Sequence, residues 1–514
     1  MTRVTLFLLV FLGLVLRLGW FLTPAGALDA DEAVFGLMAL HILQGRDYPL
    51  FCWGAHYAGA VVSYIAAAGF HLFGTNGLVL KCATLPFVAG YLAATYGLAR
   101  TCLDSRGAGL ALLFAAVPPA IPLAFSVKAT GGYPETLCLG GLALLLTFRF
   151  PRNPPVSYPV RTHLFLLGLT SGFGLYILPL ILPYLGIAVV FLALHRWPLF
   201  RSHGPWLLTG GFLGVSPLIV HNLLYPFASV LRLGSRVLEV SRQEASQASW
   251  EVAAPFTWLM DHAARLPGRL PTLLGNVGPL LGLTTSVGAL AGVAILAIAG
   301  AALWRARGIP GQDGRDVPCG IWLACLMPAI LLFAWLTGLN RPRHLVSLYS
   351  VVPIGLSAVC TQIRMASPRL ARFVLAAVLL GAGANIIAAA TIHSTASVEE
   401  LHHTFRTRGT RAVYTDYWIA YPLMFASREA VLAAPIAWAD GPISDRTPAI
   451  TRQVDRLASP AYAFLRMRPE AEWFAHGLQR RNVAFRREAI AEFDVFTELS
   501  APVRSASLPV TRGW

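Results

Sequence analysis

The apolar stretch VTLFLLVFLGLVLRLGWFL occupies residues 4–22, and the acidic stretch LDADEAVFGLMALH follows at residues 28–41. The first stretch has the roughly 20 apolar residues that a helix needs to cross a bilayer, and Arg17 is its one charged residue. The second stretch begins with three carboxylates and then turns apolar, which predicts an amphipathic helix where the chain leaves the membrane. Together they indicate a membrane protein that holds an acidic segment at one membrane surface.

The composition extends this interpretation to the whole chain. Of the 514 residues, 56% are hydrophobic and 13% are charged, and the mean hydropathy is +0.61. A soluble domain is about one quarter charged, so a water-soluble enzyme and a disordered protein are both excluded. The net charge of +15 does not call for a nucleic-acid partner, because Arg on cytoplasmic loops orients membrane helices. The seven cysteines have no CxxC spacing and predict neither a disulfide framework nor a zinc site.

Apolar stretches of this length recur along the first three quarters of the chain and predict a polytopic α-helical membrane protein. We expect about 11 spans, at residues 4–22, 77–99, 107–125, 134–150, 164–179, 181–195, 205–223, 279–303, 318–339, 345–361 and 370–392. The residues Ala25-Gly26-Ala27 fit a signal-peptide cleavage site. The apolar run before them is long for a signal peptide and contains Arg17, so we expect a retained anchor.

The apolar segment 57–73 is left out of this count, and we predict that it lies flat at the membrane surface. Counting it as a span would put five Arg clusters outside, whereas omitting it puts all five in the cytoplasm, as the positive-inside rule requires. These clusters are Arg100/Arg106, Arg149/Arg152/Arg161, Arg196/Arg201, Arg305/Arg307/Arg315 and Arg364/Arg369/Arg372. The N-terminus is then cytoplasmic, and carboxylate chemistry belongs to the outer face of a cell inner membrane.

This topology divides the chain into a membrane domain at residues 1–392 and an exoplasmic or periplasmic domain at residues 393–514. The membrane domain presents a first outer loop at 23–76 and a large outer loop at 224–278. The tail is more polar, with 15 Arg and 13 Asp or Glu. Its local patterns predict a small α/β domain with strands at 411–415, 430–434, 483–485 and 493–496 and helices at 417–427 and 470–481.

The candidate catalytic residues are the three first-loop acids, Asp31, Glu32 and Asp29. Asp31 stands at the start of the predicted helix, where a carboxylate can cap the helix and meets the positive end of its dipole. One alternative is that Asp29 or Asp31 is only an N-cap and that the acids form a solvated rim. Three carboxylates against an apolar surface favour a functional site.

The order of features in this loop resembles a known family. Asp31-Glu32-Ala opens a helix, Gly45-Arg-Asp-Tyr-Pro49 forms a turn, and a flat helix follows at 57–74. This order resembles the first exoplasmic loop of the GT-C glycosyltransferases. It is most similar to the family 39 relatives, which include protein O-mannosyltransferases and the aminoarabinose transferases that modify lipid A. The resemblance covers residues 1–360 and adds Gly211-Phe-Leu-Gly-Val-Ser-Pro217 with Asn222, and Arg341-Pro-Arg343-His344.

The resemblance implies an integral membrane glycosyltransferase with a GT-C fold. Such an enzyme transfers a sugar from a polyprenyl-phosphate-linked donor to a glycan, glycolipid or protein acceptor at the outer membrane face. In this family the acid at the position of Asp31 acts on the acceptor hydroxyl as a base or as an orienting acceptor. An inverting displacement needs such a carboxylate behind the anomeric carbon, and it needs cations that stabilise the departing lipid phosphate.

The candidate cations for this phosphate are Lys128 in the second outer loop and Arg343, Arg341 and His344 in the turn before the tenth span. A lysine at a membrane edge often only snorkels to water. Arg341 and Arg343 lie outside, where the positive-inside rule does not call for Arg. Close aminoarabinose-transferase relatives have a Lys-Pro pair before the flat helix, where this chain has Trp53-Gly-Ala-His56-Tyr57. His56 is either a replacement cation or part of an interfacial aromatic belt.

The candidate acceptor or sugar contacts are Glu135, Tyr133, Tyr57 and Trp258. Some GT-C enzymes use an acid at the place of Glu135 for a metal ion. A single acid without a neighbouring ligand supports hard-cation binding poorly, so no tightly bound metal is predicted. Trp258 either stacks on a sugar or marks the membrane interface.

Two alternatives remain at the sequence level. A transporter or flippase of lipid-linked sugars would carry paired charges near mid-membrane, whereas the acids here gather at one face. A polymerase or ligase would use the same face with a lipid-linked oligosaccharide, and the composition does not separate it from the first hypothesis.

Overall fold

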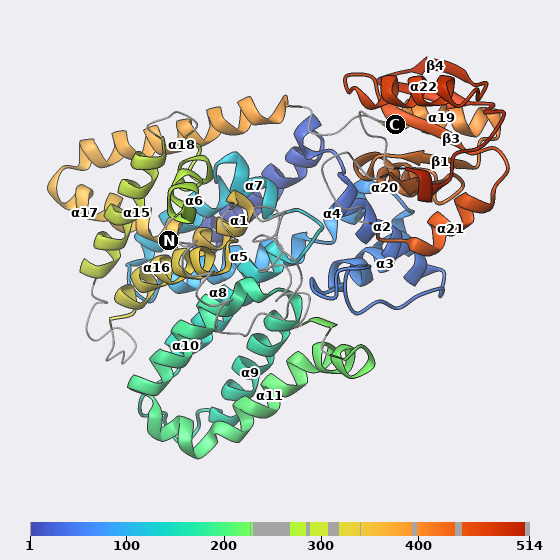
Figure 1. Ribbon diagram of the computed structural model, residues 1–514. Coiled ribbons are helices and arrows are strands. Elements are labelled where there is room, and N and C mark those ends of the chain that lie inside the picture. Colours follow the sequence, from blue (N-terminus) through green and yellow to red (C-terminus); the bar gives the residue numbers. More distant parts are fainter. Residues whose placement is uncertain are drawn as a thin grey trace. The chain divides into compact units, whose positions relative to one another are not determined.

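The computed structural model describes residues 2–226, 228–229, 268–283, 288–306, 318–339, 341–392, 398–436 and 445–508. The described chain is mostly helical (Figure 1). Its contacts form two compact units. The first, which we call the membrane unit, comprises residues 1–23, 57–59 and 84–391. The second comprises residues 24–56, 60–83 and 392–514, and we call it the outer unit after its predicted exoplasmic location. The predicted division at residue 392 stays a prediction, and the contacts group most of the first loop with the tail.

The membrane unit is built from apolar helices. In chain order they are α1 (Arg3–Phe21), α5 (Leu85–Ala99), α6 (Ser105–Ala116), α7 (Ala120–Phe125), α8 (Tyr133–Arg149), α9 (Val160–Ile177), α10 (Leu182–His195), α11 (Trp197–Leu224), α14 (Val277–Leu280), α15 (Gly288–Arg305), α16 (Cys319–Thr337), α17 (Val352–Ala366) and α18 (Pro368–Ala390). Two 3₁₀ segments, η2 (Pro179–Ile181) and η3 (Pro342–Ser350), interrupt this series.

Within the described residues, six helices are long and apolar enough to cross a bilayer. They are Arg3–Phe21, Gly77–Ala99, Trp197–Leu224, Gly288–Arg305, Cys319–Thr337 and Pro368–Ala390. A seventh span results if η3 and α17, which meet at a bend of 51°, are counted together. The prediction of a multi-pass helical membrane protein is confirmed, whereas the predicted number of 11 spans is not. One reason is that proline breaks some stretches: α6 ends just before Pro118-Pro119, and only the short α7 follows.

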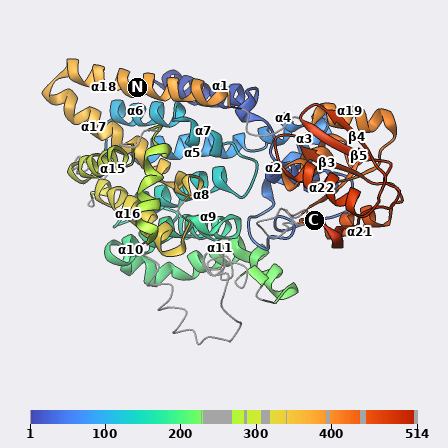
Figure 2. The same cartoon turned by 45° about the horizontal axis from the view of Figure 1, so that its top comes forward.

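Helices α9 and α11 pack unusually closely through glycine, and they run side by side in both views (Figure 1, Figure 2). A Cβ added at Gly172 would lie 2.1 Å from the carbonyl oxygen of Gly211, and one at Gly168 would lie 2.0 Å from that of Leu207. Small residues let helix backbones approach in this way where lipid removes the hydrophobic drive for association. We call this contact the glycine seam.

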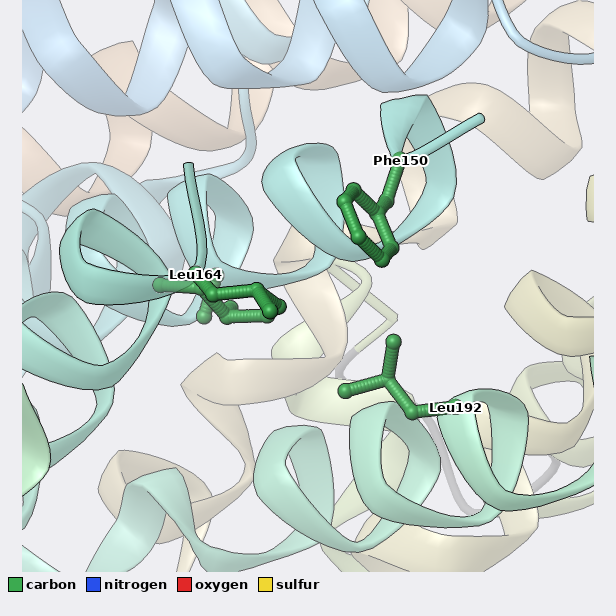
Figure 3. Close-up of a cluster of buried hydrophobic side chains, with 5 residues drawn as sticks. Phe150, Leu164 and Leu192 are labelled. Atoms are coloured by element: carbon green, nitrogen blue, oxygen red, sulfur yellow. The ribbon is translucent and has the colours of Figure 1, made fainter. Parts of the chain in front are cut away.

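A buried apolar cluster joins three neighbouring helices of the same unit. Figure 3 shows Phe150 at the end of α8, Leu164 of α9 and Leu192 of α10 pointing toward one another. Ala143 and Leu167 complete the buried set. The cluster positions α8, which carries the candidate residues Tyr133 and Glu135 at its first turn.

Arg17, in the second half of α1, is fully buried and hydrogen-bonded. Its guanidinium donates to the Ser126 hydroxyl at 3.0 Å and to the carbonyl oxygens of Gly13, Ala116 and Ala115 at 2.9, 3.1 and 3.2 Å. α6 ends at Ala116, and the last carbonyls of a helix lack partners within the helix. Arg17 therefore supplies the donors that this helix end needs.

The outer unit contains a five-stranded sheet of order β2-β1-β3-β5-β4. Its strands are β1 (Ala412–Thr415), β2 (Leu432–Pro435), β3 (Ala461–Leu465), β4 (Arg486–Ile490) and β5 (Phe493–Thr497). β1 pairs in parallel with β2 and β3, while β5 pairs antiparallel with β3 and β4. The helices of the tail are α19 (Glu399–Arg408), α20 (Tyr417–Ala426), α21 (Pro448–Arg456) and α22 (Glu470–Arg480), and the 3₁₀ segment η4 (Ser505–Ser507) follows.

The predicted small C-terminal sheet is therefore confirmed, but one strand is misplaced and the central strand β3 is not among the predicted ones. A strand was expected at 483–485, and the structure forms β4 at Arg486–Ile490 instead. The cross-strand partner explains the shift, because the register pairs Arg486 with Thr497 and Ile490 with Phe493. Tertiary pairing here overrides the local apolar pattern.

The first loop supplies three helices to this unit, α2 (Ala30–Leu43), α3 (Val61–Phe73) and α4 (Gly77–Cys82), after the 3₁₀ segment η1 (Pro24–Gly26). The prediction of an amphipathic helix at the start of the loop is wrong, because α2 is buried along Ala30 and Glu32–Leu40. α3 and α20 pack against it, and a Cβ at Gly36 would meet the Phe425 ring at 2.7 Å. α3 has 13 residues, fewer than a span needs.

Candidate functional site

The three first-loop acids lie at the start of α2, where each has a different partner. Asp29 is the N-cap: its side chain accepts from the Glu32 backbone N–H at 3.0 Å, and the Glu32 carboxylate accepts from the Asp29 N–H at 3.4 Å. This reciprocal arrangement is a capping box. The expectation that Asp31 caps the helix is therefore corrected, because Asp29 occupies the N-cap position.

Glu32 also forms a buried ion pair within the outer unit. The Lys81 ammonium of α4 donates to both carboxylate oxygens of Glu32 at 2.8 and 2.7 Å. Glu32 is 1% exposed and Lys81 is 7% exposed. Asp29 and Glu32 therefore have structural roles, because their contacts fix the start of α2 and join it to α4.

Asp31 differs from its neighbours because its contact reaches the tail. The phenol of Tyr417, the first residue of α20, donates to Asp31 Oδ1 at 2.6 Å. Within the part of the chain that the structure describes, this is the one hydrogen bond to the Asp31 side chain. Burial, followed by the nearby Asp31 carboxylate, raises the pKa of Tyr417, so the phenol stays protonated and remains a donor.

Arg446, just before α21, adds a cation to this cluster. It interacts electrostatically with Asp31 and with Tyr417. Its Nη1 donates to the Trp53 carbonyl at 3.4 Å, and its backbone N–H donates to the Tyr421 hydroxyl at 2.6 Å. Its Nε is buried and has no hydrogen-bond partner among the described residues.

Cys52 is the remaining group beside this cluster. The thiol is buried, and burial raises its pKa to about 12, with the charges of Arg446 and Asp31 as smaller influences. A thiol with this pKa stays neutral at physiological pH and is a poor nucleophile. We call Asp31, Tyr417, Arg446 and Cys52 the Asp31 cluster.

A second polar contact joins the first loop to the tail at the other end of α2. Glu429 accepts from His41 Nε2 at 2.8 Å and pairs with Arg46. The His41 ring also meets the Trp53 ring edge-on, with centroids 4.8 Å apart. Burial alone would raise the pKa of Glu429, but the hydrogen bonds from His41 and Arg46 outweigh it and lower this pKa.

Sequence reasoning missed Tyr417, Arg446 and Glu429 as partners of the first loop. Tyr417 stands in an aromatic stretch of the tail, Tyr414-Thr-Asp-Tyr-Trp418, that is typical of both sugar sites and small cores. Arg446 has no distinguishing local pattern among the many Arg residues of the tail. Their roles depend on contacts across more than 380 positions, such as the 386 residues that separate Tyr417 from Asp31.

In the membrane unit, the predicted second outer loop brings Lys128 and Tyr133 to one aromatic residue, Phe125. The Lys128 ammonium lies 5.6 Å from the centroid of the Phe125 ring, and the Tyr133 ring meets the same ring edge-on at 5.2 Å. Gly131 and Gly132 between them have φ of 64° and 82°. This left-handed backbone favours glycine and makes the tight turn into α8.

Glu135 lies in the first turn of α8 and is 1% exposed. Its Oε2 has no hydrogen-bond partner in the described part of the chain. No group of three metal-ligating side chains occurs among the described residues, and the predicted lack of a tightly bound metal stays a prediction.

The candidate cations Arg341, Arg343 and His344 fall at the start of η3. Arg343 Nε donates to His344 Nε2 at 3.3 Å, while the buried Nδ1 of His344 has no partner among the described residues. Arg341 is exposed. Arg343 and His344 are therefore brought together, and Arg341 is not part of that contact.

The remaining candidates lie elsewhere. His56 has φ of 55° between Gly54 and Ala58, which have φ of 65° and 66°, so this stretch is a run of left-handed turns before α3. Tyr57 follows it and is half-buried. Trp258 lies outside the described residues.

Comparison with known proteins identifies the fold. No family model and no curated protein matches the sequence. Among solved structures, ArnT from Cupriavidus metallidurans in the apo state has a TM-score of 0.60 at 13% identity, over 97% of this chain and 98% of that chain. The same enzyme bound to undecaprenyl phosphate has a TM-score of 0.56 at 14% identity, over 97% and 99%.

A second protein matches over the same extent of this chain. The archaeal oligosaccharyltransferase AglB from Archaeoglobus fulgidus, in complex with an inhibitory peptide and a dolichol-phosphate, has a TM-score of 0.53 at 12% identity. The match covers 99% of this chain and 74% of that chain. The fold that the first loop predicted is confirmed: the chain is similar in structure to ArnT and AglB along nearly its whole length and has the GT-C fold.

Proposed function

We propose that this protein is a membrane glycosyltransferase that uses a polyprenyl-phosphate-linked sugar as donor. Its acceptor is an envelope glycan, a glycolipid or a protein at the outer face of the inner membrane. Asp31 is the base for the acceptor hydroxyl, and Lys128 and Arg343 receive the lipid phosphate that leaves. The reaction inverts the anomeric centre, because one carboxylate directs the acceptor to the face opposite the leaving phosphate.

The shared GT-C fold supports the donor class. One similar structure is ArnT bound to undecaprenyl phosphate, and another is AglB with a dolichol-phosphate. Both ligands are polyprenyl phosphates that reach a protein from the bilayer. A chain of the same fold with apolar spans and an acidic outer loop is suited to a donor of the same chemistry.

The observation that carries the catalytic assignment is that the three acids at the start of α2 have different partners. Asp29 caps the helix and Glu32 is held by Lys81, so both are engaged by the local structure. Asp31 uses Oδ1 to accept from Tyr417, and Oδ2 remains for a hydroxyl group. A general base needs such a positioned oxygen within hydrogen-bond reach of the proton it takes.

The phosphate-binding assignment rests on the chemistry of the candidate cations. Lys128 is held over an aromatic ring, and Arg343 is adjacent to His344. A guanidinium offers paired donors that match phosphate oxygens, so Arg343 is the principal contact. Tyr133 and Glu135, on the helix that follows Lys128, are proposed sugar or acceptor contacts.

The experiment compares envelope glycans and glycolipids by mass spectrometry in a deletion strain complemented with wild type, Asp31→Asn or Asp47→Asn at matched protein levels. Asp47→Asn is the matched control, because it removes a first-loop charge whose carboxylate accepts from the Trp53 indole at 2.9 Å. We expect a sugar-sized mass increment in the wild-type and Asp47→Asn strains and its loss in the Asp31→Asn strain.

The mass of the increment also separates the alternatives. A single-sugar increment supports the transferase, whereas an oligosaccharide increment supports a polymerase or ligase. A full wild-type pattern with Asp31→Asn contradicts the proposed base. If no glycan differs between the deletion and wild-type strains, a transporter of lipid-linked sugars becomes the better hypothesis.

The phosphate role has its own test. Arg343→Ala should reduce product at least ~10-fold at a normal protein level, because a charge-assisted contact to phosphate is lost. Arg369→Ala is the control, since Arg369 is exposed and is predicted to face the cytoplasm. Near-normal turnover in Arg343→Ala would remove Arg343 from the site.

A further inference from the structure

The contacts of Asp31 come mainly from the tail, which suggests a role for that domain in the reaction. We propose that Tyr417 and Arg446 are positioning residues that orient the Asp31 carboxylate toward the acceptor, so that the tail is part of the catalytic centre. The inference rests on the proposed function and deepens it. Nothing in the sequence pattern assigns this role to either residue.

Tyr417 is held rigidly enough to orient a carboxylate. It is the first residue of α20, whose N-cap Asp416 accepts from the Trp418 N–H at 2.6 Å. Its ring meets the rings of Trp418 and Tyr421 edge-on, with centroids 5.4 and 5.0 Å apart. A phenol fixed in this way and 2.6 Å from Asp31 Oδ1 leaves Oδ2 for the acceptor.

Arg446 adds a positive charge beside this contact. It interacts electrostatically with both Tyr417 and Asp31, and the Tyr417 phenol donates to Asp31. The side chain of Arg446 donates to the Trp53 carbonyl, and its backbone N–H donates to the Tyr421 hydroxyl. A donor and a nearby cation both favour the charged form of a carboxylate.

The other ionisable groups around Asp31 do not oppose this effect. Cys52 is neutral at physiological pH because burial raises its pKa to about 12. Lys81, on α4, is engaged by both oxygens of Glu32. Tyr64, on α3, interacts with Asp47 and Tyr48. The cation that interacts with Asp31, Arg446, belongs to the tail.

The chemical step assigns each group one task. The acceptor hydroxyl forms a bond to the anomeric carbon while the bond from that carbon to the phosphate oxygen breaks. The hydroxyl proton passes to Asp31 Oδ2, and the lipid phosphate departs with the bonding electron pair. Tyr417 and Arg446 exchange no proton. They hold the Asp31 carboxylate by Oδ1, so that Oδ2 remains to accept the proton.

The test measures the rate against external pH in spheroplasts, using the mass increment defined by the deletion strain as the product. Tyr417→Phe removes the donor, and Arg446→Gln removes the cation while leaving the phenol in place. The matched control is Tyr414→Phe, which removes another Tyr–Asp hydrogen bond of the same domain, the one to Asp455. Arg446→Lys is the conservative variant.

We expect the acidic limb of the rate profile to move to higher pH by about one unit in Tyr417→Phe and Arg446→Gln. The sign follows because the loss of a hydrogen-bond donor or of a nearby cation favours the protonated form of a carboxyl group, which cannot act as a base, so activity is lost at a higher pH. At neutral pH the rate should drop several-fold, and Arg446→Lys should recover part of the shift. Tyr414→Phe should keep the wild-type limb.

Rates are compared at equal amounts of folded protein, measured by fluorescence-detected size exclusion. An unshifted acidic limb in both Tyr417→Phe and Arg446→Gln overturns the inference, even if their rates fall. If Tyr417→Phe does not accumulate, the Arg446→Gln profile decides alone. If Asp31→Asn is active, the proposed function itself is overturned. If Asp31→Asn is inactive but the acidic limbs of Tyr417→Phe and Arg446→Gln do not move, only the inference about the tail is overturned.

Discussion

The glycine seam of the membrane unit and the first-loop contacts of the outer unit are held together by opposite means. At the seam, α9 and α11 approach until backbone meets backbone, and a Cβ at Gly172 would lie 2.1 Å from a carbonyl oxygen. In the outer unit, α2 is joined to α4 and to the tail by carboxylates paired with Lys81, Tyr417, His41 and Arg46. The first contact depends on shape, and the second depends on charge.

The difference follows from the surroundings of each unit. Lipid is as apolar as the helices themselves, so association there rests on close packing. The outer unit buries carboxylates such as Glu32. A buried ion pair fixes two elements in one arrangement, but the charge that remains when one partner is removed destabilises the fold. The seam should therefore respond to added volume, and the outer unit should respond to lost charge and to pH.

The largest effect on stability is expected from Glu32→Gln. The change leaves the Lys81 ammonium buried without its carboxylate, which costs about 3–5 kcal/mol. Thermal unfolding of the detergent-purified protein, followed by fluorescence-detected size exclusion, measures the loss. The double variant Glu32→Gln/Lys81→Met should recover most of it, because it removes the unpaired charge as well. A double variant no more stable than the single one would show that the pair is not the source of the loss.

A smaller effect is expected when volume is added to the glycine seam. Gly172→Ala places a methyl group against the backbone of α11, so the helices must separate, at about 1–3 kcal/mol. Gly186→Ala in α10 is the matched control, since a Cβ there meets nothing within 4 Å. Equal melting midpoints for the two variants would contradict the close approach of α9 and α11.

A pH-dependent effect of about 1 kcal/mol is expected from Glu429. Its pKa is lowered below the ordinary value of 4.5 because the bonds from His41 and Arg46 outweigh burial. The contribution is therefore present above pH 4.5 and is lost as the pH falls through the lowered pKa. Wild type should lose stability between pH 5 and pH 3 more steeply than Glu429→Gln, measured by thermal unfolding at each pH. Parallel curves would argue against this contact.

The smallest effect is expected from an exposed pair of the same unit. Arg486 Nη1 lies 3.4 Å from Glu498 Oε1, but the two side chains are 61% and 70% exposed. Solvent screens such a pair, so Arg486→Gln should change the stability by less than about 0.5 kcal/mol. A loss as large as that of Glu32→Gln would mean that burial does not govern these charge contacts.

Much of the fold is predictable from the sequence because it depends on local pattern. The apolar stretches, the tail helices Tyr417–Ala426 and Glu470–Arg480 and the strand Ala412–Thr415 all lie where hydrophobicity and turn residues indicate. The number of spans was less predictable. A stretch such as 107–125 is apolar throughout, yet Pro118-Pro119 divides it into two short helices.

The candidate site was only partly predictable. The acids of α2 stand out because three carboxylates adjoin an apolar run. Which of them is engaged by the structure depends on Lys81, 49 residues away, and on Tyr417, 386 residues away. No local pattern encodes such distances, and the N-cap role of Asp29 rather than Asp31 depends on where the helix begins, to within two residues.

The outer unit is assembled from segments at residues 24–56, 60–83 and 392–514, so its two halves are made at different times. About 300 residues separate the end of the first loop from the start of the tail. At the usual 5–20 residues per second of synthesis, the first loop waits roughly 15 to 60 s for α20. During that interval Asp31 lacks Tyr417, and His41 and Arg46 lack Glu429. The outer unit therefore forms last. If translation stops before the tail, the membrane helices have been made but the outer unit cannot be completed.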